Sequence, residues 1–246
     1  MDKSGLCLAT WNIHMGVGRD GQRDLGRTAR VIQEMAPDLI GLQEVDNRVD
    51  DGGNDLSRLE ALTGMQIVAG PTMQKATGDY GNAILTRLPV LKVERYDLSV
   101  KKREPRGLLI AHLDWQGERL QVAVTHLGLR PGERRNQVLR LIAYLSAEER
   151  SPLLLIGDFN EWLFWGRPLR WLHRHFGRFQ SPPSFPTCWP LFRLDHILAE
   201  PKWRLGPIQA HNSRLSVVAS DHLPLTAYFH AATEHISEKR RNQLTE

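Results

Sequence analysis

Residues 153–160 read Leu153-Leu154-Leu155-Ile156-Gly157-Asp158-Phe159-Asn160, an apolar run that stops at a glycine and leads into a carboxylate and an amide. A short aliphatic run bounded by glycine is typical of a buried strand. Several comparable runs alternate apolar and polar residues, as half-buried strands do. These strand-like runs lie at residues 6–13, 38–44, 82–86, 107–115, 119–126, 153–157, 194–198 and 225–229.

Two segments between these runs have the period of a helix instead. Leu25, Ala29 and Ile32 share one face of residues 24–35, and a second apolar face recurs in residues 133–147. The strand-like runs dominate and are often joined by short turns, which favours antiparallel pairing over a regular alternation of strands and helices. The sequence therefore predicts an α+β fold, in which two packed, mostly antiparallel sheets carry helices on their outer faces.

The composition is that of an ordinary soluble globular protein, with 246 residues, 41% hydrophobic and 24% charged. We expect one domain over residues 1–230 and a polar tail over residues 231–246. No apolar run is long enough to span a bilayer, and the first residues lack a cleavable apolar stretch. Two cysteines exclude a disulfide scaffold, so a cytoplasmic location is expected. The net charge of +4 favours anionic partners.

Polar residues follow the strand-like runs at the points where these runs end. They are carboxylates, amides and imidazoles, a mixture that suits one hard divalent cation such as Mg²⁺ or Mn²⁺. Glu44 is the best single ligand candidate, and Asn12 supplies an amide oxygen. Asp158 and Asn160, two positions apart, can hold a water and a phosphate oxygen. Each of these residues, taken alone, is equally typical of a turn or a helix cap.

Two histidines at such ends are candidates for proton transfer. His126 and His222 can donate to developing negative charge, and Asp195 can orient His222 and raise its basicity. By contrast, His173 and His175 lie two positions apart on a predicted helix, which points their rings away from each other. We therefore do not interpret that pair as a metal site.

Read together, these segments resemble the endonuclease/exonuclease/phosphatase superfamily of metal-dependent phosphohydrolases. The resemblance extends from Leu6 to about Phe229, with its motifs in order. It implies a four-layer α/β/β/α sandwich with the active site at one edge of the paired sheets. The motifs are Thr10-Trp11-Asn12-Ile13-His14, Leu42-Gln43-Glu44-Val45, Tyr80-Gly81-Asn82-Ala83-Ile84-Leu85, Thr125-His126-Leu127, Gly157-Asp158-Phe159-Asn160, Leu194-Asp195-His196-Ile197 and Ser220-Asp221-His222-Leu223-Pro224.

The resemblance also implies a role for each matching residue. Asn12 and Glu44 match the metal-binding pair, with Asp221 as an additional ligand. The residues expected to act on the water and the phosphate are His126, Asp158, Asn160, Asp195 and His222. Arg106 and Asn82 are expected to contact the substrate phosphate. The hypothesis is hydrolysis of a phosphate ester with Mg²⁺ or Mn²⁺, in which either His222 or Asp158 is the general base.

Residues 159–192 are rich in aromatic residues and arginines and follow the Asp158–Asn160 motif directly. In one interpretation, Trp165, Leu169, Leu172 and Phe176 form the core face of a helix. In a second, the arginines bind nucleic acid and the rings stack on bases. In a third, the rings enter an anionic phospholipid surface. We expect a monomer with nucleic acid as the first substrate, ahead of a phospholipid or a small phosphorylated compound. A catalytically silent binding module is the alternative from another class.

Overall fold

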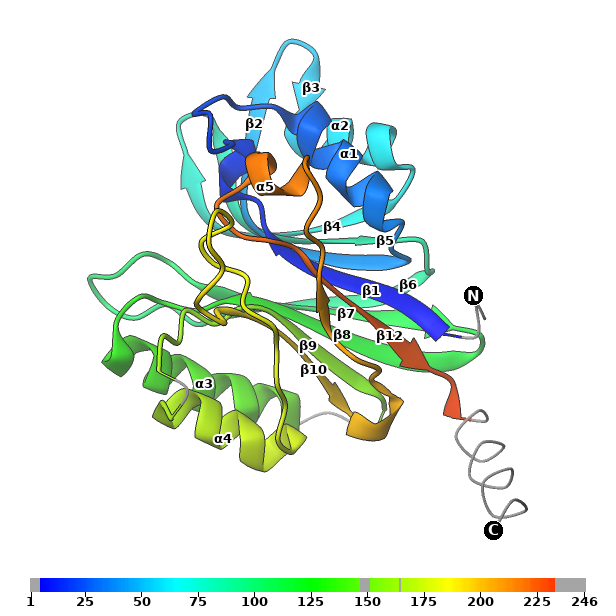
Figure 1. Ribbon diagram of the computed structural model, residues 1–246, viewed down its shortest axis with the longest axis vertical. Coiled ribbons are helices and arrows are strands. Elements are labelled where there is room, and N and C mark those ends of the chain that lie inside the picture. Colours follow the sequence, from blue (N-terminus) through cyan, green and yellow to red (C-terminus); the bar gives the residue numbers. More distant parts are fainter. Residues whose placement is uncertain (1–4, 147–150, 164, 233–246) are drawn as a thin grey trace.

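The computed structural model describes residues 5–146, 151–163 and 165–232 of the chain. It confirms the predicted α/β/β/α sandwich, with two sheets stacked between two layers of helices (Figure 1). Of the predicted tail, residues 233–246 lie outside the described residues. No helix within the described ranges is both long and apolar enough to cross a membrane.

One sheet contains both chain ends of the domain. Its strands follow the order β11-β12-β1-β2-β5-β4, with the short β3 paired to β2. These strands are β1 (Gly5–Asn12), β2 (Leu39–Asp50), β3 (Gly53–Asn54), β4 (Gln66–Lys75), β5 (Gly78–Thr86), β11 (Gln209–Ala210) and β12 (Leu225–His230).

The other sheet is built from the middle of the chain, in the order β10-β9-β8-β7-β6. Its strands are β6 (Val90–Asp97), β7 (Gly107–Trp115), β8 (Glu118–His126), β9 (Leu153–Asp158) and β10 (Asp195–Glu200). Figure 1 shows α1 (Leu25–Met35), α2 (Asp55–Thr63) and α5 (Ser216–Ala219) on one side of the sandwich, and α3 (Pro131–Ser146) and α4 (Arg167–Phe176) on the other. Two short 3-10 helices, η1 (His14–Gly16) and η2 (Lys202–Arg204), complete the described elements.

The hydrophobic core has three layers, which explains the uninterrupted apolar run in β9. Leu154 and Ile156 belong to the cluster between the two sheets, whereas Leu153 and Leu155 belong to the cluster under α3 and α4. Both faces of β9 are therefore buried, so the strand does not alternate with polar residues. Gly41 permits the close approach of the sheets, because a Cβ atom there would lie 2.7 Å from Cδ1 of Ile156.

Two parallel strand pairs determine where the polar ends meet. β1 pairs with β2 in parallel, and β8 pairs with β9 in parallel, while the other pairs are antiparallel. In each parallel pair the carboxyl ends lie at the same edge, where His126 stands opposite Asp158. β10 runs back from that edge, since Asp195 is also in register with Asp158. This edge therefore collects the polar residues that follow the strands.

Candidate active site

The carboxylate of Asp158 is the centre of the polar cluster at this edge. Its Oδ2 atom accepts a hydrogen bond of 3.1 Å from Nδ2 of Asn12, at the end of β1. The same oxygen lies 3.4 Å from Nε2 of His126 and 3.8 Å from Nε2 of His222. Three different elements thus direct nitrogen atoms at one buried oxygen. Asp158 itself is 1% exposed.

Glu44 reaches the cluster from an irregular position in β2. The pairing of β2 with β5 shifts between Leu42 and Val45, and Glu44 has a φ of 55° inside this bulge. The bulge interrupts the strand's regular alternation of side chains at this position. Nδ2 of Asn12 donates to Oε1 of Glu44 at 3.0 Å, so a single amide bridges Glu44 and Asp158.

Asp195 and His222 form a second unit on the other side of Asp158. Nδ1 of His222 lies 2.8 Å from Oδ2 of Asp195, which also accepts a 2.6 Å hydrogen bond from Oγ of Ser184. Nε1 of Trp11 donates to the backbone oxygen of His222 and holds its loop. Burial disfavours the charged imidazole, but attraction to Asp195 and Asp158 outweighs it and raises the pKa of His222 to about 10.

Arg106, His126 and Asn160 form the third unit. Nη1 of Arg106 lies 2.8 Å from Nδ1 of His126, and Nδ2 of Asn160 lies 2.9 Å from its Nε2. Both neighbours are donors, and a neutral ring accepts a hydrogen bond from only one of them. Nε2 also lies 3.4 Å from Oδ2 of Asp158. Burial lowers the pKa of His126 well below its usual value, and the positive charge of Arg106 acts in the same direction. Both effects favour the neutral form of the ring.

Burial has the opposite effect on Asp158. Removal of this carboxylate from water raises its pKa to about 7, although attraction to His222 opposes the rise. The site thus combines a carboxyl group that titrates near neutrality with an imidazole that holds its proton. Titratable groups with strongly shifted pKa values cluster at functional sites.

Two overlapping groups of side chains have the chemistry to hold a divalent cation. Glu44 and Asp158 offer carboxylate oxygens around the Asn12 amide, the oxygen-rich set that Mg²⁺ and Mn²⁺ prefer. Alternatively, ligand atoms of Asp158, Asp195 and His222 lie within 4.8 Å of one another. In that group, Oδ1 of Asp195 is buried and has no hydrogen-bond partner among the described residues. Both groups are compatible with a cation, and both include Asp158.

Comparison with known proteins agrees with this arrangement. The sequence profile of the Endonuclease/Exonuclease/phosphatase family matches residues 9–222, which contain the whole cluster. The chain belongs to the Endonuclease/Exonuclease/phosphatase family. It is 30% identical to protein YbhP of Escherichia coli K12 over 242 residues, covering 91% of this chain and 95% of that protein.

Solved structures of the family share the fold at lower identity. An endonuclease/exonuclease/phosphatase from Beutenbergia cavernae is 21% identical, with a TM-score of 0.73, covering 94% of this chain and 73% of that chain. A mannosyl-6-phosphatase from Bacteroides thetaiotaomicron is 16% identical, with a TM-score of 0.72, covering 90% of this chain and 98% of that chain. The family's neighbours thus include phosphatases, and its members act on phosphate esters.

Most of the predicted site residues meet in the cluster, but two lie outside its hydrogen-bonded centre. Asp221 is 40% exposed at the mouth, 4.0 Å from Nδ1 of His14. Asn82 lies in the adjoining wall, where it lines a small cavity together with Arg106 and His126. The members of the centre are Asn12, Glu44, Arg106, His126, Asp158, Asn160, Asp195 and His222. Their catalytic and binding roles remain predictions.

Sequence reasoning missed Ser184, which bonds Asp195, and left out His14, which lies at the mouth of the site. Ser184 belongs to an irregular segment, Ser181-Pro182-Pro183-Ser184, whose only sequence signal is that of a loop. The expected helical face was partly wrong as well. Leu169, Leu172 and Phe176 are buried on α4, but Trp165 precedes the helix and is 68% exposed.

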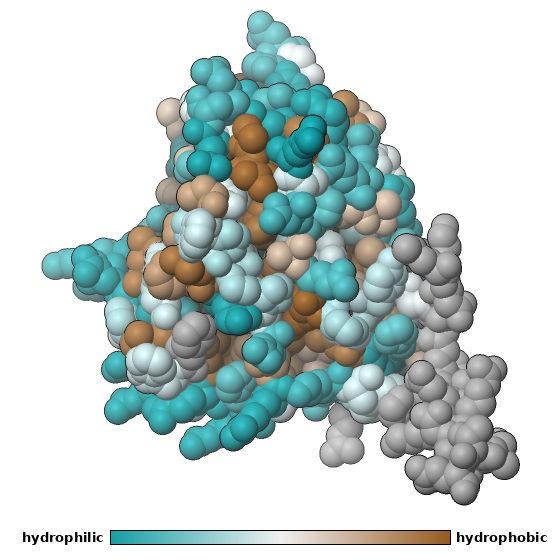
Figure 2. All heavy atoms as spheres, viewed as in Figure 1, coloured by the Kyte–Doolittle hydropathy of each residue, from teal (hydrophilic) through white to brown (hydrophobic). Residues whose placement is uncertain are grey.

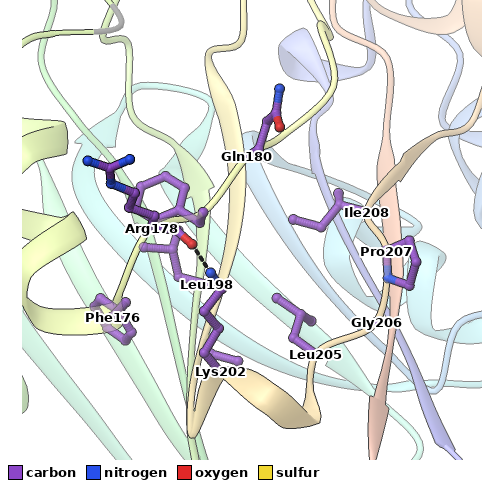
Figure 3. A pocket seen from close by; sticks show the side chains of 11 residues that line it. Phe176, Arg178, Gln180, Leu198, Lys202, Leu205, Gly206, Pro207 and Ile208 are labelled. Atoms are coloured by element: carbon purple, nitrogen blue, oxygen red, sulfur yellow. Dashed lines mark hydrogen bonds between the residues drawn. The ribbon is translucent and has the colours of Figure 1, made fainter.

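A separate pocket of about 460 Å³ lies beside α4 and the C-terminal half of β10. Figure 3 shows its mainly apolar walls, including Phe176, Leu198 and Leu205, with Lys202 bonded to the backbone oxygen of Arg178. The described residues that line it include neither a carboxylate nor an imidazole. This pocket therefore lacks the groups that family chemistry needs, and the edge cluster is the candidate active site.

Proposed function

We propose that this protein is a metal-dependent hydrolase of phosphate esters whose reaction takes place at the Asp158 cluster. The observation that carries the proposal is the convergence of Asn12, His126 and His222 on one buried oxygen of Asp158. Burial of polar groups costs free energy unless each group has a hydrogen-bond or ion-pair partner. Clusters of buried titratable groups with shifted pKa values are therefore typical of functional sites.

The metal of this proposal is Mg²⁺ or Mn²⁺, held by Glu44 with Asn12, and Asp221 is a further ligand at the mouth. When bound, the cation supplies charge neutralisation at the phosphate oxygens. The carboxylates of Glu44 and Asp158 support this choice, because they bring oxygen ligands of two strands together around the Asn12 amide. Nδ2 of Asn12 faces them and Oδ1 accepts a hydrogen bond from the backbone nitrogen of His14, so the amide would have to turn over to offer its oxygen to the ion.

The side chains around Asp158 have two further roles, which are to accept the proton of the attacking water and to bind the phosphoryl group. Asp195 fixes the His222 ring through Nδ1 and leaves Nε2 directed at Oδ2 of Asp158. Oδ2 of Asp158 or Nε2 of His222 accepts the proton of the attacking water. The raised pKa of His222 favours Asp158 at neutral pH, because a protonated imidazole has no free lone pair. Arg106, His126 and Asn160 hold the transferring phosphoryl group, with Asn82 in the adjoining wall. Donors that are already oriented supply a large share of the acceleration in such sites.

Hydrolysis of a small diester, bis(para-nitrophenyl) phosphate, tests this function directly. We expect turnover with Mg²⁺ or Mn²⁺, none with EDTA, and a loss on the order of a hundredfold in His222→Ala. His175→Ala is the matched control, since His175 lies on α4 near Glu200, outside the cluster. Near-normal turnover of His222→Ala would remove this residue from the mechanism. Binding without any metal-dependent turnover would favour the silent binding module.

A further inference from the structure

Exposed hydrophobic side chains gather beside the candidate active site. Trp165 is 68% exposed and Trp189 is 71% exposed, although both belong to segments that border the Asp158 cluster. Isolated exposed apolar residues are common, but a contiguous group marks an interaction site. We define the hydrophobic rim as Leu129, Trp162, Leu163, Trp165, Trp189 and Leu191, all of which are exposed.

A series of tilted and edge-on aromatic contacts connects the rim to the His222 imidazole. The ring of Phe185 lies 4.7 Å from that of His222, measured between centroids. Trp162 packs edge-on against Phe185 at 5.7 Å and against Phe192 at 4.7 Å. Trp189 and Leu191 belong to the same turn, since their backbone nitrogens donate to Pro186 and Phe185. The rim is thus continuous with the mouth of the site.

A buried ion pair fixes the two segments of the rim to each other. Both terminal oxygens of Glu161 accept hydrogen bonds of 3.2 Å from Arg134, and each side chain is 3% exposed. Nη1 of Arg134 also donates to the backbone oxygen of Leu129 at 2.7 Å. This pair joins the loop after β8 to the segment after β9. The part of the rim that contains Leu129 and Trp162 is therefore held in a fixed arrangement.

The exposed charge of the two segments that carry the rim has one sign. Glu133 and Glu161 are the acidic residues of segments 127–135 and 159–194, and both are buried. Figure 2 shows hydrophobic spheres among hydrophilic ones on the face where the chain runs from α4 to β10 in Figure 1. The exposed charged side chains in the described part of these two segments are all arginines, namely Arg130, Arg135, Arg167, Arg170, Arg174 and Arg178. Arg178 lies beside Lys202 of η2, away from the rim.

We propose that the hydrophobic rim docks on an anionic phospholipid surface, and that the substrate phosphate belongs to a lipid head group. Tryptophan and leucine side chains gain free energy in the interface of a bilayer, while the arginines bind lipid phosphates. A nucleic acid matches the arginines equally well, but Leu163 and Leu191 offer no ring on which a base stacks. The substrate part of this inference rests on the proposed function.

Sedimentation with lipid vesicles tests the docking surface. The vesicles contain equal parts of phosphatidylcholine and phosphatidylglycerol, and vesicles of phosphatidylcholine alone are the comparison. We expect the full chain to sediment with the anionic vesicles, and the Trp165→Ala/Trp189→Ala variant to bind them about tenfold or more weakly. Both tryptophans are more than half exposed, so the fold does not depend on them.

Trp203→Ala is the matched control, because Trp203 is an exposed tryptophan in η2, beyond the far end of β10 from Asp195. We expect it to bind vesicles as the wild type does. Equal binding by the wild type and the Trp165→Ala/Trp189→Ala variant would overturn the inference. So would a variant that loses binding of a single-stranded oligonucleotide and keeps its binding of vesicles.

Hydrolysis assays separate this inference from the proposed function. The wild type and the rim variant are compared on phosphatidylglycerol in vesicles and on soluble bis(para-nitrophenyl) phosphate. We expect the ratio of the two rates to fall about tenfold in the variant. An unchanged ratio, with the soluble diester still hydrolysed, refutes the lipid substrate and leaves the proposed function intact. No hydrolysis of either compound, with rim-dependent vesicle binding, refutes the proposed function and supports the docking surface.

Discussion

Two residues of the candidate site hold a backbone conformation that ordinarily favours glycine. Glu44 has a φ of 55° and Asn160 a φ of 50°. Such conformations cost free energy in residues with a Cβ atom and persist where surrounding structure determines them. Glu44 is held by the bulge in β2, and the backbone nitrogen of Asn160 donates to Oδ1 of Asp158. The strain is therefore located where side chains must leave the regular direction of a strand.

Ser184 gives a prediction at the same scale. Its hydroxyl is fully buried and donates to Oδ2 of Asp195, the oxygen that holds His222. Ser184→Ala removes one of two hydrogen bonds that orient Asp195. We therefore expect kcat for a soluble phosphodiester to fall about tenfold while KM changes little. Steady-state kinetics over a range of pH measures the separate changes in kcat and KM, and any displacement of the pH profile of kcat.

Ser181→Ala is the control for this substitution. Ser181 is also buried in the same segment, but its hydroxyl lies 2.9 Å from Nδ1 of His196 instead of the Asp195 carboxylate. A general loss of packing would affect both variants to the same degree. If Ser181→Ala reduces kcat as much as Ser184→Ala does, Ser184 has no specific part in positioning Asp195.

Strand ends carry most of the information that the sequence holds about the site. Asn12, His126, Asp158 and Asp195 stand at or next to the ends of predicted strands. Parallel pairing of β8 with β9 and antiparallel pairing of β9 with β10 bring the last three together, and the stacking of the two sheets adds Asn12. Ser184 was not predictable in this way, because it lies in an irregular segment and reaches Asp195 only through the tertiary fold. Bonding partners that sit on loops leave no periodic signal in a single sequence.

At the scale of elements, the buried strands and the helices α1 and α3 were predicted, whereas helix α2 and the polar edge strands were not. Residues 24–35 were expected as a helix. Helix α1 begins after Asp24, whose side chain caps the helix by accepting a hydrogen bond from the backbone nitrogen of Arg27. β4 and β6 were missed because each is the edge strand of its sheet, and apolar and polar residues alternate only weakly along it. Trp165 was assigned to a helix face, but α4 begins only at Arg167, where Pro168 occupies the first turn.

One of these edge strands gives a prediction about pH. Glu94 of β6 accepts hydrogen bonds from Lys92, Tyr96 and the buried His112. Burial alone would raise its pKa, but these donors outweigh burial and lower it to about 2. Because the folded pKa lies below the unfolded value of about 4.3, this carboxylate stabilises the fold above that pH. The contribution is lost as the pH falls toward 2.

Urea unfolding of wild type and Glu94→Gln at several pH values measures this effect. We expect the wild type to have the larger free energy of unfolding at pH 6, and the difference to shrink as the pH falls through the range from about 4 to 2. Glu60→Gln is the control, because Glu60 is exposed on α2. A difference that stays constant over this range would mean that the ionised state of Glu94 does not stabilise β6.

The whole molecule assembles the candidate site from both sheets. Asn12 and Glu44 come from the sheet under α1 and α2, whereas His126, Asp158 and Asp195 come from the sheet under α3 and α4. His222 lies in the turn before β12, so the last strand also contributes. Residues this distant in sequence meet only when the sandwich is closed. A cation bound among them must therefore stabilise the folded state over the unfolded chain.

This linkage predicts a metal-dependent melting temperature that is independent of turnover. At a Mn²⁺ concentration about 100 times its Kd, the folded state gains about 2.7 kcal/mol. For a domain of this size, that gain raises the Tm by roughly 5–10 °C. We expect Glu44→Gln to abolish the rise, because the carboxylate is the main proposed ligand. Glu200→Gln, at the far end of β10, should retain it.

Thermal scans with Mn²⁺ and with EDTA distinguish the two groups of side chains that have the chemistry for a cation. If Glu44→Gln loses the rise in Tm and Asp195→Asn keeps it, the ion binds between Glu44 and Asn12. If Asp195→Asn loses the rise and Glu44→Gln keeps it, the ion binds among Asp158, Asp195 and His222. In that case Asp158 and His222 would both be ligands, so neither would be free to accept the proton of the attacking water.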